Sequence, residues 1–187
     1  FCDNAGQCIS LYANADFCQQ ITELEGTGYH VDLLSLGSAN LVVPRCGYHY
    51  IDGILPAEVS DRMFRWAAPF DGSFVVDTVN STFDTVLAAY DRCGLNAREL
   101  ICNDDFNYPE STASRLELTL RAGEVVYLGV SGMDPFANGE FTLNYYANCT
   151  QDSDCPVRYM CVENRCEEGM SEPPGCLNDS DCNPEQQ

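Results

Sequence analysis

The sequence predicts an all-β fold, an antiparallel β-sandwich followed by a small disulfide-rich C-terminal appendage. Residues 19–148 consist of short alternating apolar and polar runs separated by Gly, Pro, Asn and Asp, which is typical of a β-sandwich. Helical character is confined to residues 13–25, where we expect coil or one brief helix. From residue 149 onward apolar residues are sparse and cysteines are dense, so this part has to be held by disulfides rather than by a core of its own.

The alternating runs predict a series of strands along the sandwich. In chain order they cover residues 30–36, 40–43, 62–68, 72–79, 82–91, 115–121, 124–131 and 139–147. Run 115–121 has leucine at every second position, so one face is apolar and the strand is half-buried. Run 124–131 is almost continuously apolar, which indicates a central strand. Because only a tight turn separates these two runs, we expect them to form a hairpin.

The cysteines predict an extracellular protein. The chain has 187 residues and 12 cysteines, none of them spaced C-x-x-C. An even number in so short a chain predicts disulfides formed in an oxidising compartment. The absence of C-x-x-C spacing disfavours a zinc ribbon, a thioredoxin-like redox site and a haem attachment site. Since the sequence begins at Phe1 rather than Met, we expect a processed chain or part of a longer polypeptide.

The last cysteines follow a repeated spacing. A complete module, C-x5-C-x5-C-x4-C, is formed by Cys149, Cys155, Cys161 and Cys166. A second run contributes Cys176 and Cys182, and the N-terminal segment contributes Cys2 and Cys8. Joining the tail of one copy to the head of another gives CLNDSDCNPEQQ/FCDNAGQC, which reads C-x5-C-x6-C-x5-C. We therefore predict that two adjacent copies together build one module.

This pattern divides the chain into four parts. They are the N-terminal half of the split module (1–18), the sandwich (19–148), the complete module (149–166), and a linker with the first half of the split module (167–187).

Spacing also suggests how the cysteines pair, although other connectivities remain open. Cys93 and Cys102 flank a loop of hairpin size, so we expect them to pair, which leaves Cys18 to Cys46. For the complete module we expect first-to-third and second-to-fourth bonds, namely Cys149–Cys161 and Cys155–Cys166. The same rule applied to the split module gives interchain bonds Cys176–Cys2 and Cys182–Cys8.

The charge of the chain limits its partners. The formal net charge is −20, and all 9 basic residues are arginine. So acidic a chain would be repelled by nucleic acid and by anionic membrane surfaces. No run of 18 apolar residues is present, so we expect no membrane span.

Residues with catalytic potential are few. His30 lies in a strand pattern and His49 in an aromatic turn, where a structural role is the better interpretation for both. Ser131 misses the G-x-S-x-G nucleophile motif by one residue and is interpreted as a strand end. Disulfide-bonded cysteines provide no thiol nucleophile. We expect no enzyme activity, no catalytic residue, no cofactor and no small-molecule substrate.

Residues 60–148 resemble the bacterial pre-peptidase C-terminal domain family. The resemblance rests on the ordered motifs FDTVL (83–87), Cys93, CNDD (102–105), SRL (114–116), AG (122–123) and GEFTL (139–143). It implies a secreted, jelly-roll-like sandwich that is usually a non-catalytic appendage. The complete cysteine module looks like the short cysteine-rich repeats of deltaproteobacterial surface proteins.

The resemblance also indicates a candidate calcium site. Four residues occupy family positions where loops converge, namely Asp84, Asn103, Asp104 and Asp105. Oxygen ligands of this kind suit Ca²⁺. The alternative is that these side chains cap turns through backbone hydrogen bonds. The pairs Asp152 with Asp154 and Asp179 with Asp181 also resemble ligand pairs, but turn-stabilising roles are favoured there.

Together these patterns predict a structural subunit, or repeat unit, of an extracellular filament assembled head to tail from identical copies. One alternative is a non-catalytic accessory or adhesion domain of a secreted hydrolase or surface protein. Another is a closed monomer in which the head cysteines pair with the tail cysteines of the same chain.

Overall fold

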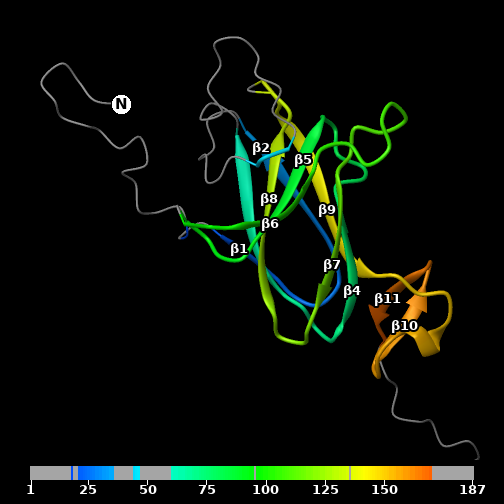
Figure 1. Ribbon diagram of the computed structural model, residues 1–187. Helices are drawn as coiled ribbons and strands as arrows, with labels where there is room; N and C mark the ends of the chain where they lie inside the picture. Colours follow the sequence, from blue (N-terminus) through cyan, green and yellow to red (C-terminus); the bar gives the residue numbers. More distant parts are fainter. Residues whose placement is uncertain are drawn as a thin grey trace, which may run out of the picture.

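A computed structural model describes residues 18, 21–35, 44–46, 60–94, 96–134 and 136–169. In this part of the chain the fold is an antiparallel β-sandwich with a small two-stranded module at one end (Figure 1), so the predicted fold class is confirmed. Outside the described residues lie the predicted strand 40–43, His49, Asp179, Asp181, and the split-module cysteines Cys2, Cys8, Cys176 and Cys182.

Two sheets form the sandwich. The five-stranded sheet has the order β1 (Thr22–Leu24), β3 (Asp61–Ala67), β8 (Val125–Gly132), β5 (Thr85–Tyr90) and β6 (Glu99–Asn103). The four-stranded sheet has the order β2 (Gly28–Leu34), β9 (Gly139–Ala147), β4 (Gly72–Asp77) and β7 (Arg115–Leu120). The end module consists of a 3-10 turn, Asp152–Asp154, and the strands β10 (Tyr159–Val162) and β11 (Arg165–Glu168).

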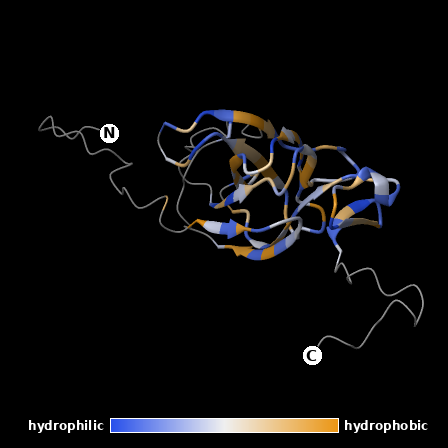
Figure 2. Cartoon of the chain, turned by 90° about the horizontal axis from the view of Figure 1, so that it is seen from below, coloured by the Kyte–Doolittle hydropathy of each residue, from blue (hydrophilic) through white to orange (hydrophobic). Residues whose placement is uncertain are grey.

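Large apolar side chains fill the space between the sheets. Phe64 and Trp66 of β3 and Phe141 of β9 have no exposed surface. The Trp66 ring meets Phe74 edge to face, with centroids 5.0 Å apart, and its indole N–H donates a hydrogen bond of 2.8 Å to the carbonyl of Gly26. Figure 2 shows apolar and polar residues alternating along the strands, as expected when one face of each sheet is buried.

The strand predictions are confirmed for most of the sandwich, with end shifts of up to three residues. The expected central strand is β8, which lies between β3 and β5. The sequence analysis missed strands in three places. Residues 22–24 were expected to be coil or helix but form β1, parallel to β3. The edge strand β6 has no buried residue and lacks apolar alternation. The strands of the end module are only four residues long.

The expected hairpin between runs 115–121 and 124–131 is wrong. β7 pairs with β4, whereas β8 pairs with β3 and β5, so the turn between them carries the chain from one sheet to the other. The turn is fixed by Ala68, whose carbonyl accepts from the amide of Gly123 at 2.8 Å. Both strands bury apolar residues in the same core from opposite sides. A short turn sets the chain reversal, but burial decides which strands pair.

Candidate functional site

The complete cysteine module is attached to the end of β9 (Figure 1). Its disulfides join Cys149 to Cys161 and Cys155 to Cys166, with Cα–Cα distances of 5.7 and 5.6 Å. The predicted first-to-third and second-to-fourth pairing is therefore confirmed. Each bond links one cysteine of the first half of the module, 149–155, to one cysteine of the second half, 161–166. No bond of this module lies within a half.

The second half of the module is a β-hairpin. Cys161 of β10 lies directly opposite Cys166 of β11. The turn residues Glu163 and Asn164 both have positive φ, 49° and 65°, as a tight two-residue hairpin turn requires. The hairpin therefore presents its two cysteines side by side, each to a different cysteine of the first half.

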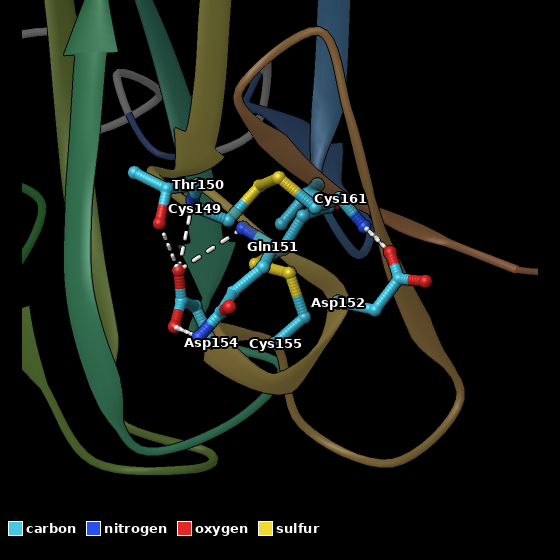
Figure 3. The surroundings of a disulfide bond; sticks show 9 residues. Cys149, Thr150, Gln151, Asp152, Asp154, Cys155 and Cys161 are labelled. Atoms are coloured by element: carbon cyan, nitrogen blue, oxygen red, sulfur yellow. Dashed lines mark hydrogen bonds between the residues drawn. A yellow bond between two sulfur atoms is a disulfide. The ribbon is translucent and has the colours of Figure 1, made fainter.

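Aspartates organise the first half of the module (Figure 3). The Asp154 carboxylate accepts hydrogen bonds from the Thr150 amide at 2.8 Å, the Thr150 hydroxyl at 2.7 Å and the Gln151 amide at 3.1 Å. These hydrogen bonds, led by the one from the Thr150 amide, hold the pKa of Asp154 below its ordinary value. The turn-stabilising interpretation of Asp154 is confirmed.

Asp152 has a different role, because it contacts the second half. Its Oδ1 accepts a hydrogen bond of 2.9 Å from the backbone amide of Cys161 (Figure 3). This is a contact between the two halves that does not involve sulfur. It holds the start of the hairpin against the loop from which Cys149 and Cys155 extend.

The module continues the core of the sandwich rather than extending from it as a separate unit. Cys149 and Cys166 are 5% and 1% exposed and belong to the main apolar cluster. Tyr159 of β10 packs edge to face on Phe70, with centroids 4.8 Å apart. The carbonyl of Cys166 accepts a hydrogen bond of 2.9 Å from the Thr27 hydroxyl. Disulfides hold this part, as expected, and packing against the core of the sandwich holds it as well.

A polar network joins the same two parts. The Arg165 guanidinium of β11 lies 4.1 Å from the centre of the Tyr146 ring, a cation–π contact. The Tyr146 hydroxyl donates a hydrogen bond of 2.9 Å to Asp77, which is 2% exposed. Asp77 also accepts from the Asn144 amide group at 2.7 Å. Burial and then the Asp77 charge raise the pKa of Tyr146.

The disulfides of the sandwich differ from the predicted ones. Cys18 pairs with Cys93, and Cys46 pairs with Cys102, each with a Cα–Cα distance of 5.9 Å. The expected Cys93–Cys102 bond is wrong because Cys102 lies opposite Ala88, inside the strand pair, whereas Cys93 lies beyond the end of β5. The expected Cys18–Cys46 bond is also wrong, because Cys18 bonds to Cys93 and Cys46 bonds to Cys102.

Three of the four predicted calcium ligands meet at one end of the sandwich. Asp84 precedes β5, Asp104 and Asp105 follow β6, and one carboxylate oxygen of each lies within 4.8 Å of the others. Burial, followed by repulsion from Asp105, Asp104 and Asp134, raises the pKa of Asp84 to about 6. Sequence patterns did not indicate Asp134, which lies in the loop after β8 and has no distinguishing motif.

The donor set of this acidic cluster fits a hard cation. Asp84 and Asp105 each have one buried carboxylate oxygen that receives no hydrogen bond. Buried carboxylate oxygens without donors are costly unless a cation neutralises them, and Ca²⁺ prefers such ligands. Asn103 does not join them. Its side-chain oxygen accepts from the Arg115 amide at 2.8 Å and its NH₂ group donates to the Asp105 carbonyl at 3.4 Å, so it positions the loop.

Two residues with catalytic potential, His30 and Ser131, lie within the described chain, and both are packed in strands of the sandwich. His30 lies in β2, where its ring packs edge to face on Phe64 at 5.2 Å. Ser131 is 2% exposed and lies next to the last residue of β8, so its interpretation as a strand end is confirmed. The sulfurs of Cys149, Cys155 and Cys166 also lie close together, but all three are oxidised in disulfides and offer no thiolate.

Comparisons with known proteins do not assign the chain. No protein family matches it. No curated protein matches it either. The four disulfides of the described residues are typical of proteins that mature in an oxidising compartment. Within the same residues, no helix has the length and apolar character needed to cross a membrane.

Proposed function

We propose that this protein is a structural subunit, or a repeat unit, of an extracellular filament or surface fibre. Adjacent copies are joined head to tail by a disulfide module whose first half comes from residues 176–182 of one copy and whose second half comes from residues 2–8 of the next. The partners are identical copies, and the role is not catalytic.

The observation that carries this proposal is the pairing within the complete module. Both of its disulfides run from the first half to the second. A module with this connectivity that is shared by two copies would be closed by two interchain bonds, Cys176–Cys2 and Cys182–Cys8. If the complete module had paired first-to-second and third-to-fourth, each half could close on itself and nothing would join the copies.

The sequence of the tail half, residues 176–182, is similar to that of the first half of the complete module, residues 149–155. Residues 149–155 read CTQDSDC and residues 176–182 read CLNDSDC. Both aspartates that form hydrogen bonds in the complete module, Asp152 and Asp154, have counterparts at Asp179 and Asp181. The tail half therefore carries both aspartates of the first half as well as its cysteines, whereas Thr150, whose hydroxyl donates to Asp154, corresponds to Leu177.

The head half is compatible with a hairpin of slightly different length. Cys2 and Cys8 are separated by five residues, one more than Cys161 and Cys166. The intervening Asn4 and Gly6 are residues that tolerate positive φ, which the turn of the complete module requires at Glu163 and Asn164.

A junction of this kind is a contact between two different surfaces of the same protein. Such contacts generate open polymers unless the rotation between copies closes a ring. The covalent equivalent is a tandem polypeptide in which successive repeats share a module. In both cases the sandwich, with the complete module fixed to its end, is the unit that repeats.

Electrophoresis without reductant tests the proposal. The 187-residue chain, refolded in oxidising buffer, is expected to form a ladder that collapses on reduction to a single band near its mass of 20.7 kDa. A single monomer band without reductant would contradict interchain joining. The accessory-domain alternative, which the family resemblance supports, predicts that monomer band as well.

A second candidate property is calcium binding at Asp84, Asp104 and Asp105. The specific observation in its favour is the pair of buried carboxylate oxygens, on Asp84 and Asp105, that receive no hydrogen bond. We propose that Ca²⁺ binds there and stabilises the loops at this end of the sandwich. Measuring how much calcium raises the unfolding temperature, over a series of pH values, tests this proposal.

A further inference from the structure

We propose that strand β2 is a surface through which two copies of this protein bind each other, by pairing antiparallel along their exposed edges. The partner is a second copy of the chain, and the contact is symmetric about Val31. It goes beyond the proposed head-to-tail junction, because it is made by a strand of the sandwich and involves no cysteine.

β2 is an edge strand with an apolar outer face. It lies at one end of the four-stranded sheet, and among the described residues its only strand partner is β9. Tyr29, Val31 and Leu33 alternate along it and are 70%, 45% and 59% exposed. His30 faces inward instead, since its ring packs on Phe64 of the other sheet. An exposed edge strand with such a face is a template for pairing with another chain.

The other sheet edges of the described chain differ from β2. At the opposite edge of the same sheet lies β7, whose most exposed residues, Glu117 and Thr119, are polar. At one edge of the five-stranded sheet, β6 is disulfide-bonded through Cys102 to Cys46. At the other edge, β1 has only three residues. Of these four edges, β2 combines a length of seven residues with an exposed apolar face.

The hydrogen bonds of Leu33 show which backbone groups face the free edge. Its amide donates to the Asp32 carboxylate at 2.7 Å, and its carbonyl accepts from the Arg62 guanidinium at 3.4 Å. Both backbone groups are therefore turned away from β9. Because the backbone groups of alternate residues in an antiparallel strand point the same way, those of Tyr29 and Val31 face the free edge as well. These three residues can form the hydrogen bonds of an additional strand pair.

The sequence of β2 is complementary to itself in one register. When two copies pair antiparallel about Val31, Tyr29 of each lies opposite Leu33 of the other, and the two Val31 side chains face each other. On the inner face His30 of each copy lies opposite Asp32 of the other, where its ring N–H can donate to the carboxylate. Both kinds of cross-strand pair stabilise a sheet. The neighbouring symmetric registers, centred on His30 or Asp32, would place two histidines or two carboxylates opposite each other.

Pairing exchanges hydrogen bonds rather than losing them. The Leu33 amide would pass from the Asp32 carboxylate to the Tyr29 carbonyl of the second copy, which leaves Asp32 to accept from His30. Each copy has a net charge of −20, so general repulsion opposes the contact. Salt screens this repulsion, and the dimer is therefore expected at high protein concentration and physiological ionic strength.

Cysteine crosslinking tests the contact and its register. The background is the full chain with serine at the four cysteines of the proposed junction, so that the junction contributes nothing. Directly paired residues that exchange hydrogen bonds have Cα atoms about 5.5 Å apart, which is within the range of a disulfide. Val31→Cys should therefore form a disulfide-linked dimer with itself. Tyr29→Cys and Leu33→Cys should crosslink slowly alone and at least about tenfold faster when mixed, because pairing raises their effective concentration. Thr119→Cys on β7 is the matched control and should crosslink only slowly.

Sedimentation without introduced cysteines gives a second measurement. In the same serine background the dimer fraction should rise with protein concentration. Val31→Lys should raise the dissociation constant roughly tenfold, because two like charges would lie opposite each other. Thr119→Lys adds the same charge and should leave the dimer intact.

Two results would overturn the inference. They are a monomer at every concentration, and crosslinking of Val31→Cys that is no faster than that of Thr119→Cys. Either result leaves the head-to-tail junction untouched, because the ladder that tests the junction is formed by the chain with all its cysteines. Conversely, absence of that ladder leaves the β2 contact standing.

Discussion

The sandwich and the complete cysteine module solve the same problem of stability by different means. The sandwich buries large side chains between two sheets and adds disulfides that span 75 and 56 residues. The module spans 149–166, uses disulfides that span 12 and 11 residues, and relies on aspartate hydrogen bonds. Under the proposed function a module of this kind is divided between two chains, whereas dividing the core of the sandwich would expose apolar surface.

The two parts are nevertheless continuous. Cys166 lies within the apolar cluster of the sandwich, and Arg165 stacks on Tyr146. The complete module is therefore stabilised in part by burial against the sandwich. Substitutions that act on one part and not the other can test this division.

The largest expected effect is in the core of the sandwich. Trp66→Ala removes a fully buried ring and its hydrogen bond to Gly26, and should lower the free energy of unfolding by about 3–5 kcal/mol. Val157, which is 92% exposed in the module, is the matched control, and Val157→Ala should change stability by less than about 0.5 kcal/mol. Urea unfolding measures both, and a similar loss for the two variants would contradict the division.

Removing disulfides should distinguish the two parts by loop length. By the loop-entropy relation, Cys18→Ser with Cys93→Ser should cost about 4 kcal/mol, and Cys155→Ser with Cys166→Ser about 3 kcal/mol. The reason is that the first bond closes a span of 75 residues and the second a span of 11. Thermal unfolding of the two double variants checks this order. A greater loss for the module pair would show that burial of Cys166 outweighs loop closure.

Calcium should stabilise the sandwich in a pH-dependent way. At a concentration 100 times the dissociation constant, a bound ion adds about 2.7 kcal/mol. Because the pKa of Asp84 is raised to about 6, calcium has to displace a proton below that pH. The calcium-induced rise in unfolding temperature should therefore be complete well above pH 6 and should disappear as the pH falls through it.

Two variants make the calcium prediction specific. Without calcium, the raised pKa of Asp84 means that stability declines as pH rises from its unfolded value of 3.8 through about 6. Asp84→Asn should remove that decline together with the calcium effect. Glu117→Gln, an exposed position on β7, should retain both. A calcium effect that persists in Asp84→Asn places the ion elsewhere.

A smaller effect is expected where the two parts meet. Tyr146→Phe removes the hydroxyl that donates to the buried Asp77 carboxylate, and should lower the free energy of unfolding by about 1–3 kcal/mol. Arg165→Met removes the cation from the same ring and should cost about 1 kcal/mol or less. Chemical denaturation of both variants provides the comparison. A neutral Tyr146→Phe would mean that Asp77 is satisfied by its remaining donors.

The same comparison explains what could be predicted from the sequence. Alternating apolar residues were sufficient to predict strands such as β7 and β9, because burial on one face imposes a period of two. The module bonds were predicted correctly, but closeness in sequence alone does not decide a pairing, since Cys93 and Cys102 are closer in sequence and do not bond. The partners of Cys93 and Cys102 were not predicted, since they depend on how Cys18 and Cys46 reach the sheet edges, which sequence spacing does not encode. The hairpin error has the same origin, because β7 and β8 are neighbours in sequence but belong to different sheets.

The candidate site was predicted in part for similar reasons. Asp84, Asp104 and Asp105 were expected to converge because the family resemblance implies that they lie where loops meet, and they do so. The separate role of Asn103 depends on its hydrogen bond from the Arg115 amide, which only the pairing of distant segments creates. The charge of Asp134 reaches the same place from a third loop.

The most direct test of the shared module is a disulfide map of mixed copies. Chains labelled with ¹⁵N and unlabelled chains are refolded together under oxidising conditions, and a protease that cleaves at aspartate is used without reduction. Asp3, Asp179 and Asp181 lie between the relevant cysteines, so each bond appears on its own peptide in the mass spectrum. We predict Cys176 linked to Cys2 and Cys182 linked to Cys8, with labelled and unlabelled partners joined. Cys2 linked to Cys8 and Cys176 to Cys182, or links only between partners of the same label, would contradict the shared module.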